Sequence, residues 1–248
     1  MSRARRRPDA ARPASRTLLA GFLSLLGEVL ITVGLVLALF VAYSLWWTNV
    51  IADRQASQRG EQVRRQWLAP SPAEPAGSAA PGAPGALDTQ DGVGFLHVPA
   101  MRDDEVLVKR GTTPEILNDG VAGYYTEPVK SALPWDEKGN FSLAAHRDGH
   151  GAVFHHIDKI RAGDAMVFET KDTWYVYKAF AELRQTSKYN VDVISPVPKE
   201  SGRTAPGRFI TLTTCTPVYT SKYRYIVWGE LVRTEKVDAR RTPPVELR

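Results

Sequence analysis

The 248-residue chain contains one cysteine, Cys215, so it cannot form a disulfide within itself, and a small fold stapled by disulfides is excluded. Histidine is scarce as well. Five histidines, with no second cysteine and no short paired spacing on an evident helix, do not make a persuasive zinc set. We therefore expect neither a metal nor a cofactor. The chain also has no internal repeat, so a solenoid or a propeller is not indicated.

Beyond its first sixteen residues the chain has no excess charge of either sign. Residues 1–16 hold six arginines and one acid, Asp9, and the remaining 26 basic and 26 acidic residues balance. The net charge of +5 thus comes from one short arm. A basic arm can bind nucleic acid. This one leads directly into an apolar run of membrane length, so nucleic-acid binding is the weaker interpretation.

The apolar run extends from Leu18 to Trp47, and no charge interrupts it after Glu28. At about 1.5 Å per helical residue, the uncharged part matches the ~30 Å hydrocarbon core of a bilayer. Aromatic residues gather at its end, as an interfacial belt would. We predict a single-pass anchor over residues 17–47, with the basic arm cytoplasmic and the rest extracellular. A signal peptide is the alternative, but the run is too long and no clear cleavage site follows.

The next segment, residues 48–92, is predicted to be a stalk and linker. Thr48–Leu68 is polar with scattered apolar residues and is typical of a helical stalk. Residues 70–92 are rich in Pro, Ala and Gly and lack the large apolar side chains that a core needs, so we predict a flexible spacer there. The folded domain is expected over residues 93–236, followed by a short C-terminal tail, 237–248.

Short β-type segments separated by turn residues recur through the folded domain. Two short helices are predicted beside them, over Thr113–Leu117 and Val153–Ile160. Many closely spaced strands with little helix indicate a single β-barrel or sandwich of roughly 145 residues. The predicted strands are Gly94–Pro99, Glu105–Val108, Phe141–His146, Ala165–Thr170, Trp174–Leu183, Phe209–Cys215 and Tyr223–Val232.

Cys215 ends one of these strands. Side chains alternate between the two faces of a strand, so Ile210 and Leu212 point one way while Thr211, Thr213 and Cys215 point the other. If the aliphatic pair enters the core, the thiol stands on the more polar face. An unpaired thiol outside the cytoplasm is unusual, which favours a nucleophile over a small buried core residue.

Two further groups at strand ends can complete such a site. His146 stands at the exit of its strand, with His150 as a rival, and its imidazole can take the thiol proton and later protonate a departing amine. Arg224 opens the strand after the cysteine loop, in competition with Arg208 and Arg233. Its guanidinium cannot act as a base, but its fixed donors suit a developing oxyanion. Nucleophile, proton-transfer partner and anion stabiliser are what acyl transfer through a thioester requires.

These segments resemble the sortases, membrane-anchored cysteine transpeptidases of Gram-positive bacteria. The Thr-Leu-x-Thr-Cys signature of that family is matched by Thr211-Leu212-Thr213-Thr214-Cys215. Its histidine segment, of the type Asn-x-x-Leu-Ala-Gly-His-Arg, is matched by Asn140-Phe-Ser-Leu-Ala-Ala-His146-Arg147. Ala145 departs from the glycine that usually precedes the histidine. Cys215-Thr-Pro217 and Gly123-Tyr-Tyr125 look most like the class E enzymes of actinobacteria.

The resemblance implies an all-β fold with an eight-stranded sortase barrel and short helices. It also implies cleavage of the Thr–Gly bond in a C-terminal signal, Leu-Pro-x-Thr-Gly or, for class E, Leu-Ala-x-Thr-Gly. Cys215, His146 and Arg224 would be catalytic. The acyl group would pass to an amine of a peptidoglycan precursor or to a pilin lysine. Tyr125 and Thr214 are the candidates for contacts with the substrate.

Two other functions stay open at this point. A cysteine hydrolase on the same scaffold would resolve the thioester with water instead of an amine, and product ratios with and without amine would distinguish it. A non-catalytic binding domain anchored to the envelope would tolerate replacement of Cys215. The joint presence of Cys215, His146 and Arg224 argues against that second alternative.

Overall fold

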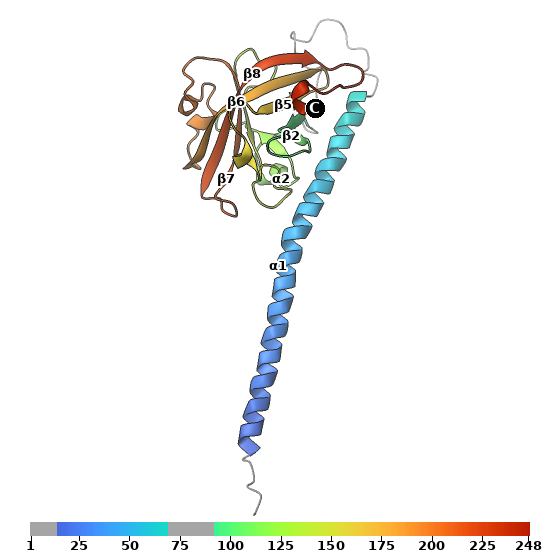
Figure 1. The fold of residues 1–248 in the computed structure, drawn as a ribbon, viewed down its shortest axis with the longest axis vertical. Coiled ribbons are helices and arrows are strands. Elements are labelled where there is room, and N and C mark those ends of the chain that lie inside the picture. The colour runs from blue at the N-terminus through green and yellow to red at the C-terminus, as the bar shows by residue number, and fades with distance from the viewer. Residues whose placement is uncertain (1–13, 69–91) are drawn as a thin grey trace, which may run out of the picture. The chain divides into compact units, whose positions relative to one another are not determined.

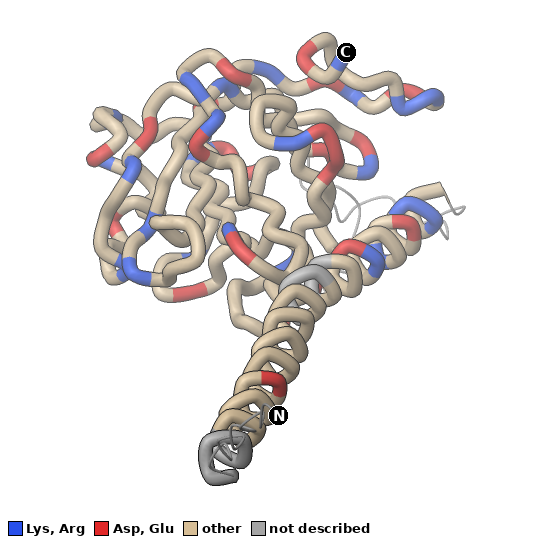
Figure 2. The backbone as a smooth tube through the Cα atoms, turned by 60° about the horizontal axis from the view of Figure 1, so that its bottom comes forward, with Lys and Arg blue, Asp and Glu red and all other residues tan. Residues whose placement is uncertain are grey.

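The computed structural model describes residues 14–68 and 92–248, so the predicted basic arm and spacer lie largely outside the described residues. The chain divides into two compact units, Met1–Trp46 and Trp47–Arg248. Helix α1 (Ala14–Leu68) runs through both. Its stretch Ala20–Tyr43 has a mean hydropathy of 2.5 and is long and apolar enough to cross a membrane. Figure 2 shows this part of the helix almost free of charge, whereas charges of both signs alternate over the second unit.

The second unit contains a closed β-barrel, as predicted (Figure 1). Neighbouring strands follow the order β1-β2-β3-β4-β7-β8-β6-β5, which leaves no open sheet edge. Short helices and 3-10 turns lie in the connections, among them α2 (Pro114–Leu117), which confirms the predicted helix there. The strands are β1 (Gly94–His97), β2 (Val106–Arg110), β3 (Ala122–Tyr124), β4 (Gly139–Ala144), β5 (Ala165–Glu169), β6 (Thr173–Ser187), β7 (Arg208–Thr216) and β8 (Tyr223–Lys236).

Three neighbouring strands, β4, β7 and β8, carry most of the residues of interest. Strand β4 pairs with β7 in parallel, and β7 pairs with β8 in antiparallel fashion. Strand β8 pairs along its other edge with the long strand β6, where the register shifts at three places. Such irregularities bend a strand, which allows these two long strands to curve around the barrel (Figure 1).

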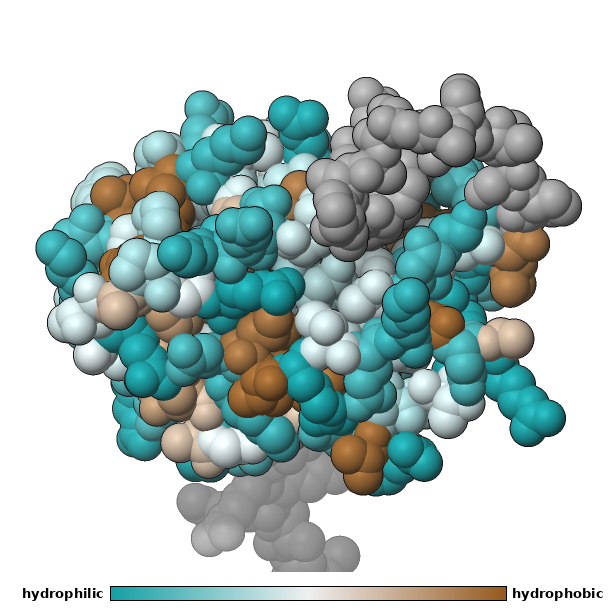
Figure 3. All heavy atoms as spheres, turned by 90° about the horizontal axis from the view of Figure 1, so that it is seen from above, coloured by the Kyte–Doolittle hydropathy of each residue, from teal (hydrophilic) through white to brown (hydrophobic). Residues whose placement is uncertain are grey.

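The barrel interior is filled by the alternate apolar side chains of these strands. Phe141 and Leu143 of β4 and Ile210 and Leu212 of β7 all belong to the main core cluster and are at most 1% exposed. The alternation predicted for both strands is therefore confirmed. The opposite rows of β4 and β7, which include Ser142 and Thr211, face the outside of the barrel. The Ser142 hydroxyl donates to the Ile194 carbonyl of the covering segment, and the Thr211 hydroxyl donates to Oδ1 of Asn140 in β4. Elsewhere on the surface apolar side chains form small separate patches among hydrophilic ones (Figure 3).

Two elements differ from the predicted segments. Strand β3 was absent from them, because it has only three residues and two of these, Ala122 and Gly123, have low β propensity. A side chain at Gly123 would collide with the carbonyl oxygen of Gly111, 1.9 Å from an added Cβ, so the close approach of the two chains requires glycine. The helix predicted over Val153–Ile160 is a single 3-10 turn, η1 (Ile157–Lys159), flanked by other turns.

The last turns of α1 pack directly on the barrel. Their buried residues recur every three or four positions and so form one stripe along the helix. Trp67 meets Phe95 edge to face, with ring centroids 5.3 Å apart. An ion pair between Arg59 and Asp119 adds a polar contact. The segment predicted as a stalk is thus helical and also belongs to the folded unit. The stripe consists of Ala52, Ala56, Gly60, Val63 and Trp67.

Candidate active site

Cys215 lies near the end of β7, directly opposite Arg224 of β8, and both side chains are half-buried. Residues that face each other across an antiparallel pair project from the same face of the sheet. The thiol and the guanidinium therefore leave the barrel on one side. Since Leu212 and Ile210 occupy the interior, that side is the outer one.

His146 reaches the same place from the other neighbouring strand. The parallel register pairs Leu143 with Leu212 and Ala144 with Thr213. A hydrogen bond of 3.3 Å from the Ala145 N–H to the Thr213 carbonyl carries the pairing one residue further. Continuing it by one more residue sets His146 beside Cys215. The extended backbone register thus aligns His146, two residues past the end of β4, with Cys215 of β7 and Arg224 of β8.

The imidazole of His146 is held by Asn118, which follows helix α2. Its Nε2 lies 2.8 Å from Oδ1 of Asn118. Because an amide oxygen only accepts, Nε2 donates its hydrogen there, and in the neutral ring Nδ1 is left to accept a proton. Burial lowers the pKa of His146 below its ordinary value. His150, whose ring centroid lies 5.2 Å from that of His146, lowers this pKa further, whereas the negative charge of Asp148 raises it by a smaller amount. This pKa shift favours the neutral imidazole, the form that can act as a base.

Arg224 is anchored through one nitrogen of its guanidinium. Nη1 donates to the carbonyl oxygens of Ser221, at 3.2 Å, and Tyr223, at 3.0 Å. Its other N–H groups make no hydrogen bond to the described part of the chain, so they are available for an acceptor that arrives beside Cys215. The competing arginines lie elsewhere: Arg208 bonds to Pro134 at the far end of β7, and Arg233 pairs with Glu235 and Glu246.

Tyr125 and Thr214, the predicted substrate contacts, lie on different sides of β7. The Tyr125 hydroxyl is 2.9 Å from Oγ1 of Thr213, on the outer face, and burial raises the pKa of Tyr125. Thr214 is 2% exposed, and its hydroxyl donates to the Ala145 carbonyl at 2.7 Å. Thr214 therefore links the two strands that carry His146 and Cys215.

An apolar cluster with a buried centre begins two residue pairs along the strands from Cys215 and Arg224. Thr213 pairs with Ile226, and Ile226 packs with Trp228 on the outer face of β8. The indole N–H of Trp228 donates to the Val193 carbonyl at 2.9 Å, which fixes the covering turn η2 (Asp192–Ile194). The outer apolar cluster comprises Val193, Ile194, Ile226 and Trp228, with Tyr125, Val129, Phe180, Ala181 and Leu183 packed against them.

Three residues around this site were not predicted from the sequence: Asn118, Arg147 and Asp148. Asn118 and Asp148 have residue types that are common in turns, and Arg147 was matched as part of the histidine motif without a role of its own. The signal that was present is position. Arg147 and Asp148 directly follow His146, and a charged side chain beside a candidate base can act on it.

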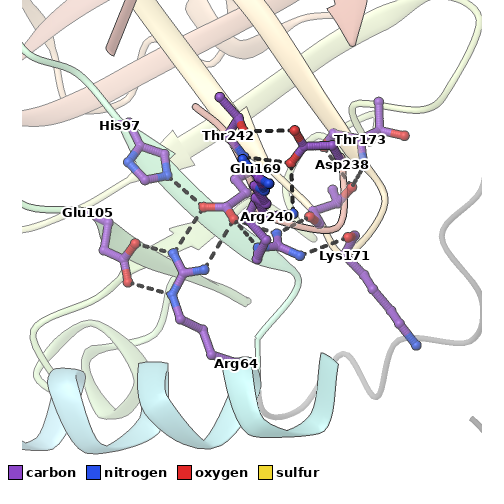
Figure 4. Close-up of polar contacts among 11 residues, drawn as sticks. Arg64, His97, Glu105, Glu169, Lys171, Thr173, Asp238, Arg240 and Thr242 are labelled. Carbon is purple, nitrogen blue, oxygen red and sulfur yellow. Dashed lines mark hydrogen bonds and ion pairs between the residues drawn. The ribbon is translucent and has the colours of Figure 1, made fainter. Parts of the chain in front are cut away.

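One group of ligand-type atoms lies apart from this site. Among the described residues, His97, Glu105 and Glu169 bring their nitrogen and oxygen atoms within 4.8 Å of one another. Figure 4 shows that Arg64 of α1 points between the two glutamates. It bonds to both, and Arg241 also donates to Glu169. The carboxylates thus belong to an ion-pair network that joins α1, the barrel and the C-terminal tail.

Comparisons with known proteins agree with this fold and arrangement. The Sortase domain family matches residues 96–232. The chain is 64% identical to "Sortase SrtE2" of Streptomyces coelicolor, over 99% of this chain and 93% of that protein. The crystal structure of Sortase E1 from Streptomyces coelicolor, which holds a tripeptide in its active site, is 44% identical with a TM-score of 0.60 and covers 64% of this chain and 98% of its own. The structure of sortase E from Streptomyces avermitilis is 33% identical with a TM-score of 0.57. It covers 66% of this chain and 100% of its own.

The family match and these relatives place this protein among the cysteine transpeptidases. The chain belongs to the sortase family and is similar to class E members of it.

Proposed function

We propose that Cys215 is the nucleophile of this sortase, with His146 as its proton-transfer partner and Arg224 as the group that stabilises the oxyanion. The observation that carries the proposal is the backbone register, which pairs Cys215 with Arg224 and, extended past the end of β4, aligns His146 with Cys215. Acyl transfer through a thioester needs a nucleophile, a proton-transfer partner and an anion stabiliser, and these three residue types supply them.

The reaction proceeds in two stages. The sulfur attacks the threonine carbonyl of a Thr–Gly bond, and the thiol proton passes to His146. Arg224 donates to the oxyanion that forms. When the C–N bond breaks, His146 protonates the departing glycine amine, and the threonine acyl group remains on sulfur as a thioester. An incoming amine then attacks the thioester, gives up a proton to His146 and releases the thiolate of Cys215.

The substrate proposed is a protein with a C-terminal sorting signal, Leu-Ala-x-Thr-Gly or Leu-Pro-x-Thr-Gly. Its apolar residues would contact the partly buried members of the outer apolar cluster, such as Val129 and Phe180, because the central Ile226 and Trp228 are fully buried. Tyr125 borders that cluster and is the proposed substrate contact, while Thr214 would act through the strand that it holds. The tripeptide in the active site of the related Sortase E1 supports a peptide substrate.

The proposed setting is the cell membrane, with α1 as a single-pass anchor, the N-terminus in the cytoplasm and the barrel outside. The length and hydropathy of Ala20–Tyr43 support the anchor. The six arginines that precede it support the orientation. The acceptor would then be an amine of the cell envelope, on a peptidoglycan precursor or a pilin lysine.

Full-length protein in detergent, incubated with sorting-signal peptides and an amine acceptor, tests the proposal. Cleavage at Thr–Gly that requires Cys215 is expected, with more transfer than hydrolysis when amine is present. Peptides that carry alanine or proline at the second motif position reveal the preferred signal. Hydrolysis alone, at every amine concentration, would instead identify a hydrolase.

A further inference from the structure

The two residues that follow His146 both reach across to the segment that carries Cys215. Arg147 is 6% exposed, and its Nη1 donates to Oγ1 of Thr216 at 2.9 Å and to the Cys215 carbonyl at 3.5 Å. The guanidinium of the residue after the candidate base is thus bonded to the candidate nucleophile's own backbone and to the next residue.

The remaining contacts of Arg147 fix its orientation. Nη2 donates to Asp158 at 3.0 Å, Nε donates to the His155 carbonyl at 3.4 Å, and the guanidinium lies 5.5 Å from the centroid of the Tyr225 ring. Burial of a charge is costly unless it is paired and hydrogen-bonded. This planar fork with several fixed donors meets that condition, and the single ammonium of a lysine cannot reproduce it.

The side chain of Asp148 makes the second contact with the segment around Cys215, at the loop between β7 and β8. Its Oδ2 accepts the N–H of Tyr219 at 2.6 Å. Tyr219 has a φ of 64°, in the left-handed region that costs energy for any residue except glycine. The carboxylate therefore holds the loop after Cys215 in a conformation that it would not adopt without support.

We infer that Arg147 and Asp148 are positioning residues that set the separation of the His146 imidazole and the Cys215 sulfur. The inference rests on the proposed roles of those two residues. These contacts of Arg147 and Asp148 lie within a few residues of the reacting groups, so they add local restraints to the alignment that the barrel strands provide. A misplacement of about 1 Å between reacting groups costs on the order of 100-fold in rate.

Steady-state cleavage of a sorting-signal peptide by full-length variants tests this inference. For Arg147→Met we expect kcat to fall about 100-fold while KM changes less than about threefold, because positioning affects the reacting groups more than substrate binding. Arg147→Lys should recover only part of the loss. Arg240→Met, which removes an exposed arginine of the tail, should match the wild type.

Two further variants separate positioning from folding. Thr216→Val removes the hydroxyl that accepts from Arg147 but keeps the guanidinium charge, so it should lower kcat. In the Arg147→Met background it should have little added effect, because both substitutions remove the same hydrogen bond. Asp148→Asn keeps an acceptor for Tyr219 and should be milder than Asp148→Leu. Thermal unfolding shows whether each variant is folded at the assay temperature.

The inference is overturned if folded Arg147→Met and Asp148→Leu variants keep the wild-type kcat. It is also overturned if Thr216→Val and Arg147→Met act independently. Failure of the proposed function has a different signature: the wild type itself would then show no cleavage that depends on Cys215, and the positioning role would fall with it.

Discussion

Cys215 and Arg224 are register partners in the antiparallel pairing of β7 and β8. Their relative position is therefore set by backbone hydrogen bonds of the barrel and not by a flexible loop. The following predictions use this rigid frame, in which a side chain can be changed while its neighbours stay in place.

Arg224→Lys should lower kcat by about 100-fold or more, the cost of removing one oxyanion donor in a preorganised site. Lysine keeps the charge but loses the fork of N–H groups, one of which is already bonded to backbone carbonyls. Steady-state peptide cleavage measures the effect. Arg233→Lys, at the other end of the same strand, is the matched control and should retain the wild-type kcat; equal losses in both variants would refute the assignment.

The pKa of His146 should lie below 6.5, because burial disfavours the imidazolium. The unfolded chain then binds a proton that the folded chain does not. Consequently the free energy of unfolding should fall as pH drops from about 6.5 to the lower pKa of the folded state. Asn118→Asp should raise the pKa of His146 by placing a carboxylate at Nε2. NMR titration of the ring measures both values, and an unchanged His146 pKa in this variant would mean that Asn118 does not face the ring.

Glu169→Gln should destabilise the fold by about 3 kcal/mol at neutral pH, since it removes one partner of a buried ionic network. Burial alone would raise the pKa of Glu169, but hydrogen bonds from His97, Arg64 and Arg241 lower it to about 2. Stability from this lowered pKa is present above pH 4.5 and is lost as pH falls toward about 2. Denaturant titrations should therefore show the variant approaching the wild type in acid. Glu137→Gln, an exposed control, should have little effect at any pH.

Trp67→Ala should free the end of α1 from the barrel and cost about 3 kcal/mol, as for other buried tryptophans. The ring packs on Phe95 and closes the apolar stripe of the helix. Hydrogen exchange should accelerate at residues 52–67 while the barrel strands stay protected. Replacement of Leu68, which is 75% exposed, provides the control, and protection of the helix that survives Trp67→Ala would contradict the packing described above.

The faces of the strands could be predicted from the sequence, because apolar and polar side chains alternate along them. Alternation assigned Ile210 and Leu212 to the interior and Thr213 and Cys215 to the other face. The order of the strands could not be predicted in this way: local pattern does not reveal that β4 pairs with β7, almost seventy residues further on, and this pairing brings His146 to Cys215. The docking of α1 was not predicted because three of the five residues in its stripe, Ala52, Ala56 and Gly60, are small and gave a weak apolar signal within a polar segment.

The contacts of individual polar side chains could not be predicted from the sequence either. Asn118 and Asp148 have the residue types of ordinary turns, and only the folded chain brings Asn118 to Nε2 of His146 and Asp148 to the N–H of Tyr219. A turn signal identifies where the chain reverses. It does not identify what the side chain will meet.

Intact mass spectrometry of the full-length enzyme, quenched in acid during turnover of a sorting-signal peptide, tests the central claim most directly. We predict an added mass equal to the peptide fragment that ends at threonine, attached at Cys215 and removed by an amine acceptor. It should be absent in Cys215→Ala, which should also lose cleavage. Peptide cleavage that persists in Cys215→Ala, or an adduct on any other residue, would contradict the account.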